Sequence, residues 1–124
     1  QAGTLSANPV AMAAGLATLK QLDEKFYKDL NAKSQEITTL LSQWMKENGF
    51  EDYSITSYKS LFWPAPLKNP ITQIEQIPTT LAERFKILFK TLLEKGIYLS
   101  PNGYEIGFIS SAHDVSELKK RLWN

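Results

Sequence analysis

The feature that most constrains the fold is a stripe of apolar side chains at helical spacing over residues 26–45. Charged and amide side chains largely occupy the other faces, which predicts one long amphipathic helix. The stripe has one polar gap, at Lys33 and Ser34, where the period asks for an apolar residue. Asn48 and Gly49 end the helix with a left-handed cap signal. A stripe of this kind indicates core packing rather than a cofactor pocket. Its members are Phe26, Leu30, Ile37, Leu40, Leu41, Trp44 and Met45.

Shorter elements surround this helix. Apolar periodicity predicts helices from Pro9 to about residue 22, from Thr79 or Thr80 to Gly96, and after Asp114. β-Branched and aromatic residues predict strands at 53–56, 59–63, 97–100 and 105–110. Prolines at positions 64, 66 and 70 exclude a long central strand, so the stretch 64–78 is expected to be a surface loop. The order of elements predicts an α+β fold, a small antiparallel sheet with helices packed on one face.

Composition excludes several classes of function. The chain has 124 residues, which is one domain at most, and a formal net charge of +1. That charge predicts no nucleic-acid partner. There is no cysteine and one histidine, His113, which excludes disulfides, zinc–thiolate sites and thiol catalysis. No apolar run reaches the roughly 20 residues that span a bilayer, and the start is not a signal peptide. We therefore expect a cytoplasmic protein with no metal and no membrane partner. Because the chain begins with Gln1, we expect it to be cut from a longer protein.

Ahead of the first helix, Gly3, Thr4 and Ser6 form a small polar loop, and Asn8 and Pro9 supply a cap and a favoured first helical residue. Such a loop before a helix N-terminus can hold a phosphate or another anion. It lacks the several glycines of a P-loop or dinucleotide fingerprint, so spacing alone favours an ordinary capped helix. Within that helix, ordinary core contacts are expected from Leu16, Leu19 and Leu22.

The residues alone form no convincing catalytic constellation, and we predict no catalytic residue in this chain. His113 precedes a helix without an evident nucleophile partner, which favours a packing or capping role. Glu105 follows a turn, where a carboxylate is usually solvated. The lysines fall mostly on helix faces, and none has the apolar surroundings of a Schiff-base lysine.

Two separated motifs nevertheless resemble a known family. The first is Ala2-Gly3-Thr4-Leu5-Ser6-x-Asn8-Pro9 running into Met12-Ala13-Ala14-Gly15-Leu16. The second is Gly96-Ile97-Tyr98-Leu99-Ser100-Pro101 followed by Tyr104 to His113. Their order and spacing are similar to class III aminotransferases of the pyridoxal-phosphate type I fold, above all to the aminomutase members, which move an amino group between adjacent carbons. The chain has no arginine between Arg84 and Arg121, where many ordinary members hold a substrate carboxylate.

The resemblance implies that the catalytic residues and the residues of this chain lie in different domains of one enzyme. The catalytic lysine and the aspartate under the pyridine nitrogen belong to a large domain upstream, so this chain would be the C-terminal part of a pyridoxal 5'-phosphate enzyme, inactive by itself. Residues 1–8 would be a loop from the large cofactor-binding domain, and residues 9–124 the small α+β domain. Family members are homodimers, in which Gly3 and Thr4 would contact the cofactor phosphate of the neighbouring subunit. Glu105 would lie near the entrance for a small-molecule substrate.

Some positions depart from the family pattern, and two alternatives stay open. Ala7 replaces the usual glycine, Lys59 stands where a glycine commonly precedes Ser60, and the stretch 64–78 matches poorly. The first alternative is another class III aminotransferase or an amino-acid epimerase. The second is a free-standing α+β binding module without catalytic function.

Overall fold

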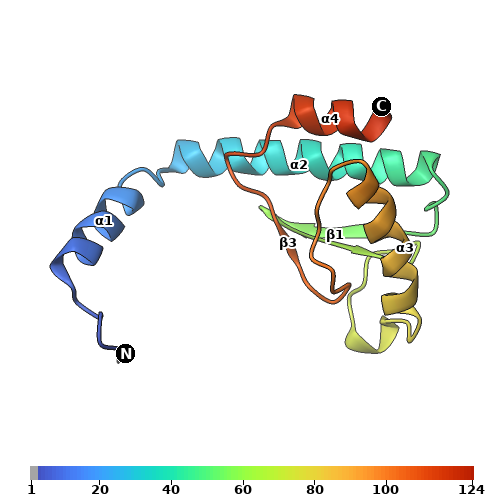
Figure 1. Cartoon of the computed structure of the whole chain (residues 1–124), viewed down its shortest axis with the longest axis horizontal. Coiled ribbons are helices and arrows are strands. Elements are labelled where there is room, and N and C mark those ends of the chain that lie inside the picture. The colour runs from blue at the N-terminus through green and yellow to red at the C-terminus, as the bar shows by residue number, and fades with distance from the viewer. Residues whose placement is uncertain (1–2) are drawn as a thin grey trace.

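The long amphipathic helix is α2 (Glu24–Glu47) in the computed structural model, which describes residues 3–124 (Figure 1). The Asp23 carboxylate caps it by accepting the Phe26 N–H at 2.7 Å. Gly49, with φ of +84°, ends it in the left-handed region as predicted. The stripe is buried in the C-terminal half of the helix, at Ile37, Leu41, Trp44 and Met45.

The three strands form one antiparallel sheet in the order β1-β2-β3. They are β1 (Ser54–Tyr58), β2 (Leu61–Ala65) and β3 (Gly107–Phe108). The first two form a hairpin closed by Lys59 and Ser60, in which Ile55 pairs with Pro64. The third strand is short and pairs only with Leu61 and Phe62. The predicted antiparallel sheet is confirmed, but the strands expected at 53–56 and 59–63 lie at 54–58 and 61–65, so Lys59 and Ser60 form the turn and not the start of the second strand.

Pro64 lies in the middle strand, although proline cannot donate to a β-ladder. Hydrogen-bonded and non-hydrogen-bonded pairs alternate along an antiparallel hairpin, and Ile55 with Pro64 is a non-hydrogen-bonded pair. The nitrogen of Pro64 therefore faces away from β1. On that side β3 pairs only with Leu61 and Phe62, and no ladder bond is lost at Pro64. The strand ends at Ala65, before Pro66, so the prediction that no long strand forms here is confirmed, whereas the expected end of the strand before Pro64 is wrong.

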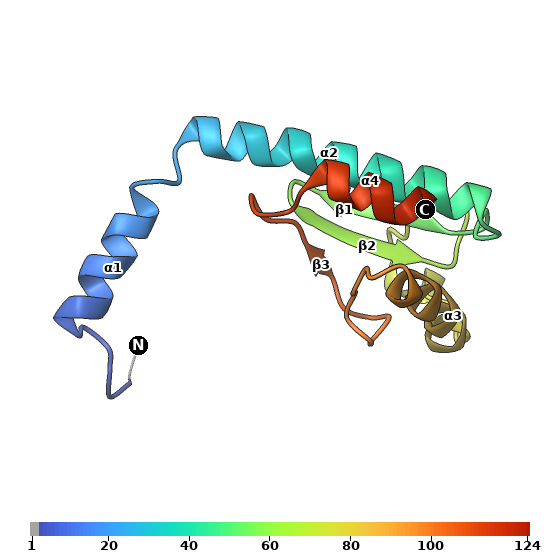
Figure 2. The same cartoon turned by 45° about the horizontal axis from the view of Figure 1, so that its top comes forward.

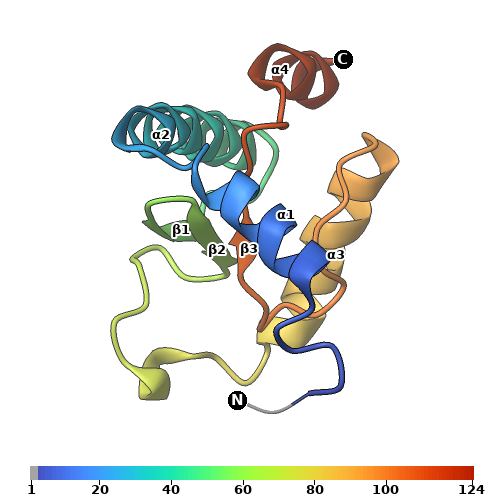
Figure 3. The same cartoon turned by 90° about the vertical axis from the view of Figure 1, so that its left-hand side faces the viewer.

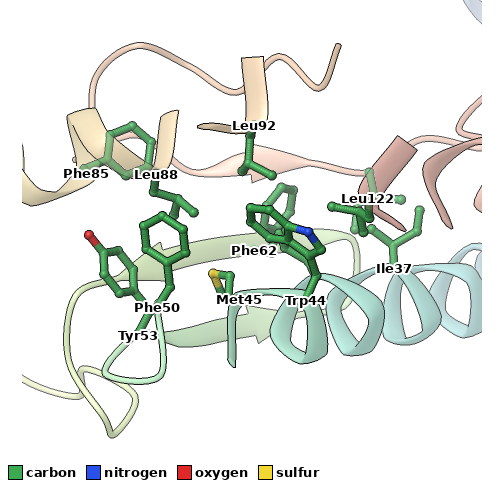
Figure 4. Packing of buried hydrophobic residues seen from close by; sticks show 12 residues of the cluster. Ile37, Trp44, Met45, Phe50, Tyr53, Phe62, Phe85, Leu88, Leu92 and Leu122 are labelled. Atoms are coloured by element: carbon green, nitrogen blue, oxygen red, sulfur yellow. The ribbon is translucent and has the colours of Figure 1, made fainter. Parts of the chain in front are cut away.

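The helices cover one face of this sheet. Seen end-on, α2 lies along the sheet, and α3 (Leu81–Glu94) and α4 (Val115–Trp123) complete the layer (Figure 3). Phe62 of β2 points into the core between these helices, and Phe50 and Tyr53, which follow α2, pack edge to face with ring centroids 5.4 Å apart (Figure 4). Each of these three helices contributes buried side chains, among them Leu88 of α3 and Leu122 of α4. The α+β architecture with helices on one face is confirmed.

Helix α1 (Pro9–Leu19) differs from expectation. It begins at the predicted residue, but it extends away from the sheet and the other helices (Figures 1 and 2), and none of its residues is buried. The core contacts expected of Leu16 and Leu19 are wrong for this chain, since these side chains are 56% and 66% exposed. Leu22, beyond the helix end, is half-buried. Apolar spacing predicts a buried surface, but it does not say which part of a protein covers it.

Two strand predictions also need correction. Residues 97–100 form no strand, and the strand expected at 105–110 is reduced to Gly107–Phe108. The composition of 97–100 suits a strand, but a strand also needs a neighbour, and the open side of β2 is occupied by β3. The surface loop expected at 64–78 begins later than predicted, because Pro64 and Ala65 belong to β2 and Pro66 is also buried. The stretch that follows is largely exposed and contains one short 3-10 turn, η1 (Ile74–Gln76).

Candidate functional site

The N-terminal loop has the geometry of a capped helix start. The Asn8 side-chain oxygen accepts the N–H groups of Val10 (3.0 Å) and Ala11 (3.2 Å), and Pro9 follows at the first helical position. The Thr4 side chain is exposed. Ala7 adopts φ of +61°, in the region that favours glycine, at the position where the related family usually has one. Of the expected 1–8 loop, Gln1 and Ala2 lie outside the described residues.

A second feature is a cavity of about 820 Å³ beside β3. Its floor is apolar, formed by core side chains such as Ile37, Leu41 and Phe62. Its rim carries polar and charged groups, Ser100, Glu105, His113, Glu117 and Arg121. An apolar pocket with a few convergent polar groups is the usual form of a small-molecule site. No short-range sequence pattern predicts this cavity, because it is built by segments far apart in the chain.

Glu105 lies in the loop before β3 and is held in place by its neighbours. Its carboxylate accepts hydrogen bonds from Ser100 Oγ (2.5 Å) and Asn102 Nδ2 (3.4 Å). The Glu105 N–H donates to the Asn102 carbonyl oxygen at 3.0 Å. Glu105 therefore does not start a strand, as the sequence suggested, but closes a hydrogen-bonded turn. The turn presents a preoriented carboxylate at the rim of the cavity.

His113 has a structural role. Its Nδ1 accepts the Ser110 N–H at 3.0 Å, and Ser110 Oγ lies at the same distance. Because a backbone N–H can only donate, this contact assigns the neutral Nε2–H tautomer to the ring. The loop between β3 and α4 is tightened by this bond, in agreement with the packing or capping role expected of His113.

The polar gap in the apolar stripe of α2 makes three long-range hydrogen bonds that sequence reasoning missed. The half-buried Lys33 extends its Nζ to the carbonyl oxygens of Ser111 (2.6 Å) and His113 (2.9 Å). Ser34 is 1% exposed, and its Oγ donates to the Lys59 carbonyl oxygen at 2.6 Å. The signal was present in the sequence as a break in apolar periodicity.

The predicted site residues do not form one cluster in this chain. The loop that carries Gly3 and Thr4 lies beyond α1, far from the loop before β3 that carries Glu105 (Figures 1 and 2). Within residues 3–124, no group of three or more acidic or histidine side chains could hold a metal ion. No helix of that part of the chain is both long and apolar enough to cross a membrane.

The chain is similar to parts of characterised enzymes. It is 44% identical over 115 residues to a glutamate-1-semialdehyde 2,1-aminomutase of Leptospira biflexa, a match covering 91% of this chain and 27% of that protein. The enzyme of the same name from Leptospira interrogans is 40% identical over 124 residues, covering 98% of this chain and 28% of the relative. The chain therefore spans a little over a quarter of these relatives. No protein-family model matches it.

Solved structures share the fold. A β-phenylalanine aminotransferase from Variovorax paradoxus matches with a TM-score of 0.79 and 22% identity, over 98% of this chain and 28% of that one. A transaminase with pyridoxal phosphate bound matches with a TM-score of 0.71 and 24% identity, over the same shares. The resemblance seen in the two motifs is confirmed: the chain is homologous to one stretch of the glutamate-1-semialdehyde 2,1-aminomutases and has the fold of the corresponding part of pyridoxal-phosphate transaminases.

Proposed function

We propose that the chain is part of a pyridoxal-phosphate-dependent aminomutase that converts glutamate-1-semialdehyde to 5-aminolevulinate, a step of tetrapyrrole (porphyrin) biosynthesis. The observation that carries the proposal is the 44% identity to an enzyme of this name over 91% of the chain. The whole protein is a cytoplasmic homodimer with a small-molecule substrate and no nucleic-acid or membrane partner. Residues 1–8 belong with the cofactor-binding domain, and the small domain follows; the exposure of α1 favours placing that helix with the cofactor-binding domain as well.

The N-terminal loop fits a phosphate group. Because Asn8 already accepts the first N–H groups of α1, the donors for an anion are in the loop itself, at Gly3 and Thr4. A backbone amide and a hydroxyl are good donors to phosphate. No acidic residue stands in the first turn of α1 to repel an anion. When bound, the cofactor supplies the electron sink for the amino-group transfer.

The separation of the two site segments supports an arrangement across a dimer. Gly3 and Thr4 bind the cofactor phosphate in the neighbouring subunit, whereas Glu105 orients the substrate at the entrance of its own subunit's site. One chain then contributes to two active sites, which accounts for the distance between its two loops.

The test uses the full-length protein with Thr4→Val, with Thr4→Ser as the conservative variant and Ser6→Ala as the matched control. Loss of a hydrogen bond to a charged group weakens cofactor binding roughly tenfold or more in Thr4→Val. Thr4→Ser and Ser6→Ala keep the affinity, which is followed by the absorbance of the bound cofactor. Unchanged affinity in Thr4→Val contradicts the role of the loop.

A mixed dimer tests whether the loop acts across the interface. One subunit carries Thr4→Val, and the other lacks the catalytic lysine of the upstream domain but keeps Thr4. The only competent lysine site then receives an intact loop from its neighbour, so cofactor affinity at that site returns to the parent value. Weak binding in the mixed dimer shows that the loop acts within its own subunit.

The second candidate is another class III aminotransferase, which the transaminase fold of the structural neighbours favours. The two candidates differ in substrate. Rapid formation of 5-aminolevulinate from glutamate-1-semialdehyde supports the aminomutase. Turnover of ω-amino acids with a keto-acid acceptor, and none of the semialdehyde, supports the aminotransferase.

A further inference from the structure

The short strand β3 needs help to keep its register. It pairs with β2 at two positions only, Leu61 with Phe108 and Phe62 with Gly107. One further bond, from the Ile109 N–H to the Ser60 carbonyl oxygen at 2.8 Å, extends the ladder. A slip by two residues, the smallest that keeps each side chain on its own face of the sheet, would move the chain about 6.6 Å. Ile109, which is 4% exposed, would leave its place in the core.

Two adjacent residues of α2, Lys33 and Ser34, form hydrogen bonds to the chain segments on either side of this pairing. Ser34 Oγ donates a hydrogen bond to the carbonyl oxygen of Lys59, which is next to the Ser60 carbonyl that accepts the Ile109 N–H. Lys33 Nζ holds the carbonyls of Ser111 and His113, immediately after β3. The two anchors connect α2 with segments 25 to 80 residues away along the chain. Both partners of the β2–β3 pairing are thereby tied to one turn of the same helix.

We propose that Lys33 and Ser34 are positioning residues that set the register of β3 and, through it, the place of Glu105. Glu105 precedes Gly107 by two residues, so a shift of β3 displaces the Glu105 carboxylate from the rim of the cavity. Lys33 is suited to this role because an ammonium group can donate to two carbonyl oxygens at once. The consequence for Glu105 rests on the proposed function, but the register role does not.

An engineered disulfide reads the register directly: residues 1–124 contain no cysteine, and any cysteine in the rest of the full-length protein is first replaced by serine. Leu61 faces Phe108 across the β2–β3 ladder. Hydrogen-bonded and non-hydrogen-bonded pairs alternate along an antiparallel ladder, and the pair of Leu61 with Phe108 is a non-hydrogen-bonded one. Such pairs have Cα atoms about 4.5 Å apart, within the range of a disulfide. Leu61→Cys with Phe108→Cys therefore reports the observed register. Leu61→Cys with Ile106→Cys or with Ser110→Cys reports a two-residue slip in either direction.

The full-length protein with each reporter pair is then combined with Lys33→Met or Ser34→Ala. We expect the rate of the 61–108 cross-link to fall roughly tenfold in Lys33→Met, as for a lost hydrogen bond to a charged group, and a slip reporter to gain. Lys33→Arg restores the rate. Lys28→Met and Ser42→Ala, on the same helix, serve as matched controls and leave it unchanged. An unchanged 61–108 rate in both Lys33→Met and Ser34→Ala overturns the proposal.

Kinetics separate positioning from mere loss of stability. If Lys33 positions Glu105, Lys33→Met raises KM for the semialdehyde and largely keeps kcat. A lower kcat at constant KM means fewer folded molecules and overturns the link to Glu105. Where Lys33→Met does not fold, the single variant Ser34→Ala and the rescue by Lys33→Arg carry the same comparison. A protein that lacks aminomutase activity but shows the Lys33-dependent cross-link refutes the proposed function and supports the register role.

Discussion

The ring of Phe62 lies against the backbone of Gly107, its partner across the β2–β3 ladder. A Cβ built on Gly107 would come within 2.4 Å of Phe62 Cε1, closer than side chains tolerate. Phe62 is 7% exposed and packed in the core, so its ring has little room to move.

We therefore expect Gly107→Ala to lower the free energy of unfolding by about 1–3 kcal/mol, the usual cost of overpacking. Urea denaturation measures it. Gly15→Ala is the control, because a Cβ there meets nothing within 4 Å and alanine favours a helix. Equal stability of the two variants would contradict the contact.

The hairpin residue Lys59 adopts φ of +53°, a backbone conformation that costs a residue with a Cβ about 1–2 kcal/mol. Glycine avoids this cost but loses about 0.5–1 kcal/mol more chain entropy. Lys59→Gly should therefore raise stability by about 0.5–1 kcal/mol, measured as a higher midpoint in urea. Lys59→Ala, which keeps the Cβ and removes the charge, should bring no gain; a gain in Lys59→Ala as large as in Lys59→Gly would point to the charge instead.

Arg84 holds three segments together. Its guanidinium forms an ion pair with Asp52, donates to the Pro66 carbonyl at 2.9 Å and lies 5.3 Å from the centre of the Tyr53 ring. Lysine cannot reproduce this planar set of contacts, so Arg84→Lys should cost about 1–2 kcal/mol. Arg121→Lys is the control, since the ion pair of the exposed Arg121 is with Glu117, one turn away on the same helix, and the change should cost at most about 0.5 kcal/mol. Thermal unfolding at matched pH compares them; similar losses would refute the distinction.

The N-cap of α4 predicts a pH dependence. A hydrogen bond from Ser116 Oγ, and then the N–H groups of Glu117 and Ser116, lower the pKa of Asp114. A carboxylate with a lowered pKa in the folded state stabilises the protein above its unfolded pKa of about 3.9 and loses that contribution as the pH falls through the folded value. Asp114→Asn should therefore flatten the fall in melting temperature as the pH drops below about 4. Glu83→Gln, an exposed carboxylate in the first turn of α3, controls for net charge. If the melting temperature of Asp114→Asn falls with decreasing pH as steeply as that of the parent, the cap does not cause the pH dependence.

Glu105 can be tested without disturbing the fold. Glu105→Gln keeps the size of the side chain but replaces an acceptor oxygen with a donor, opposite Ser100 and Asn102. In the proposed aminomutase we expect KM for the semialdehyde to rise several-fold while cofactor affinity stays at the parent value, since one hydrogen bond changes and the phosphate contacts lie elsewhere. Glu94→Gln is the matched control. A loss of cofactor affinity in Glu105→Gln would place the residue at the cofactor instead.

Local patterns predicted the elements whose causes are local. The α2 stripe, the left-handed Gly49 and the Asp114 cap all act within a few residues, and each is found where the sequence placed it. Patterns that depend on a partner failed. The segment 97–100 has strand composition but no free neighbour, and α1 has core composition but no core beside it in this chain.

The candidate site was predictable only through resemblance. Gly3, Thr4 and Glu105 have no chemical signature that distinguishes them from an ordinary loop or a solvated carboxylate. The cavity beside β3 is assembled from α2, α4 and the loop around Glu105, which no short-range pattern connects. Lys33 and Ser34 were visible as a break in periodicity, but only the folded chain shows which carbonyl groups they hold.

The packing of α4 on α2 has a consequence during synthesis. Lys33 meets its first partner, Ser111, 78 residues later in the chain. At about 5–20 residues per second, the ribosome needs about 4–16 seconds to cover that interval. Throughout it, the apolar stripe of α2 lacks Leu122, one of the side chains that bury it. The nascent chain therefore carries a partly uncovered apolar surface on α2 for seconds, and the protection of that surface in the cell depends on whatever binds it before α4 emerges.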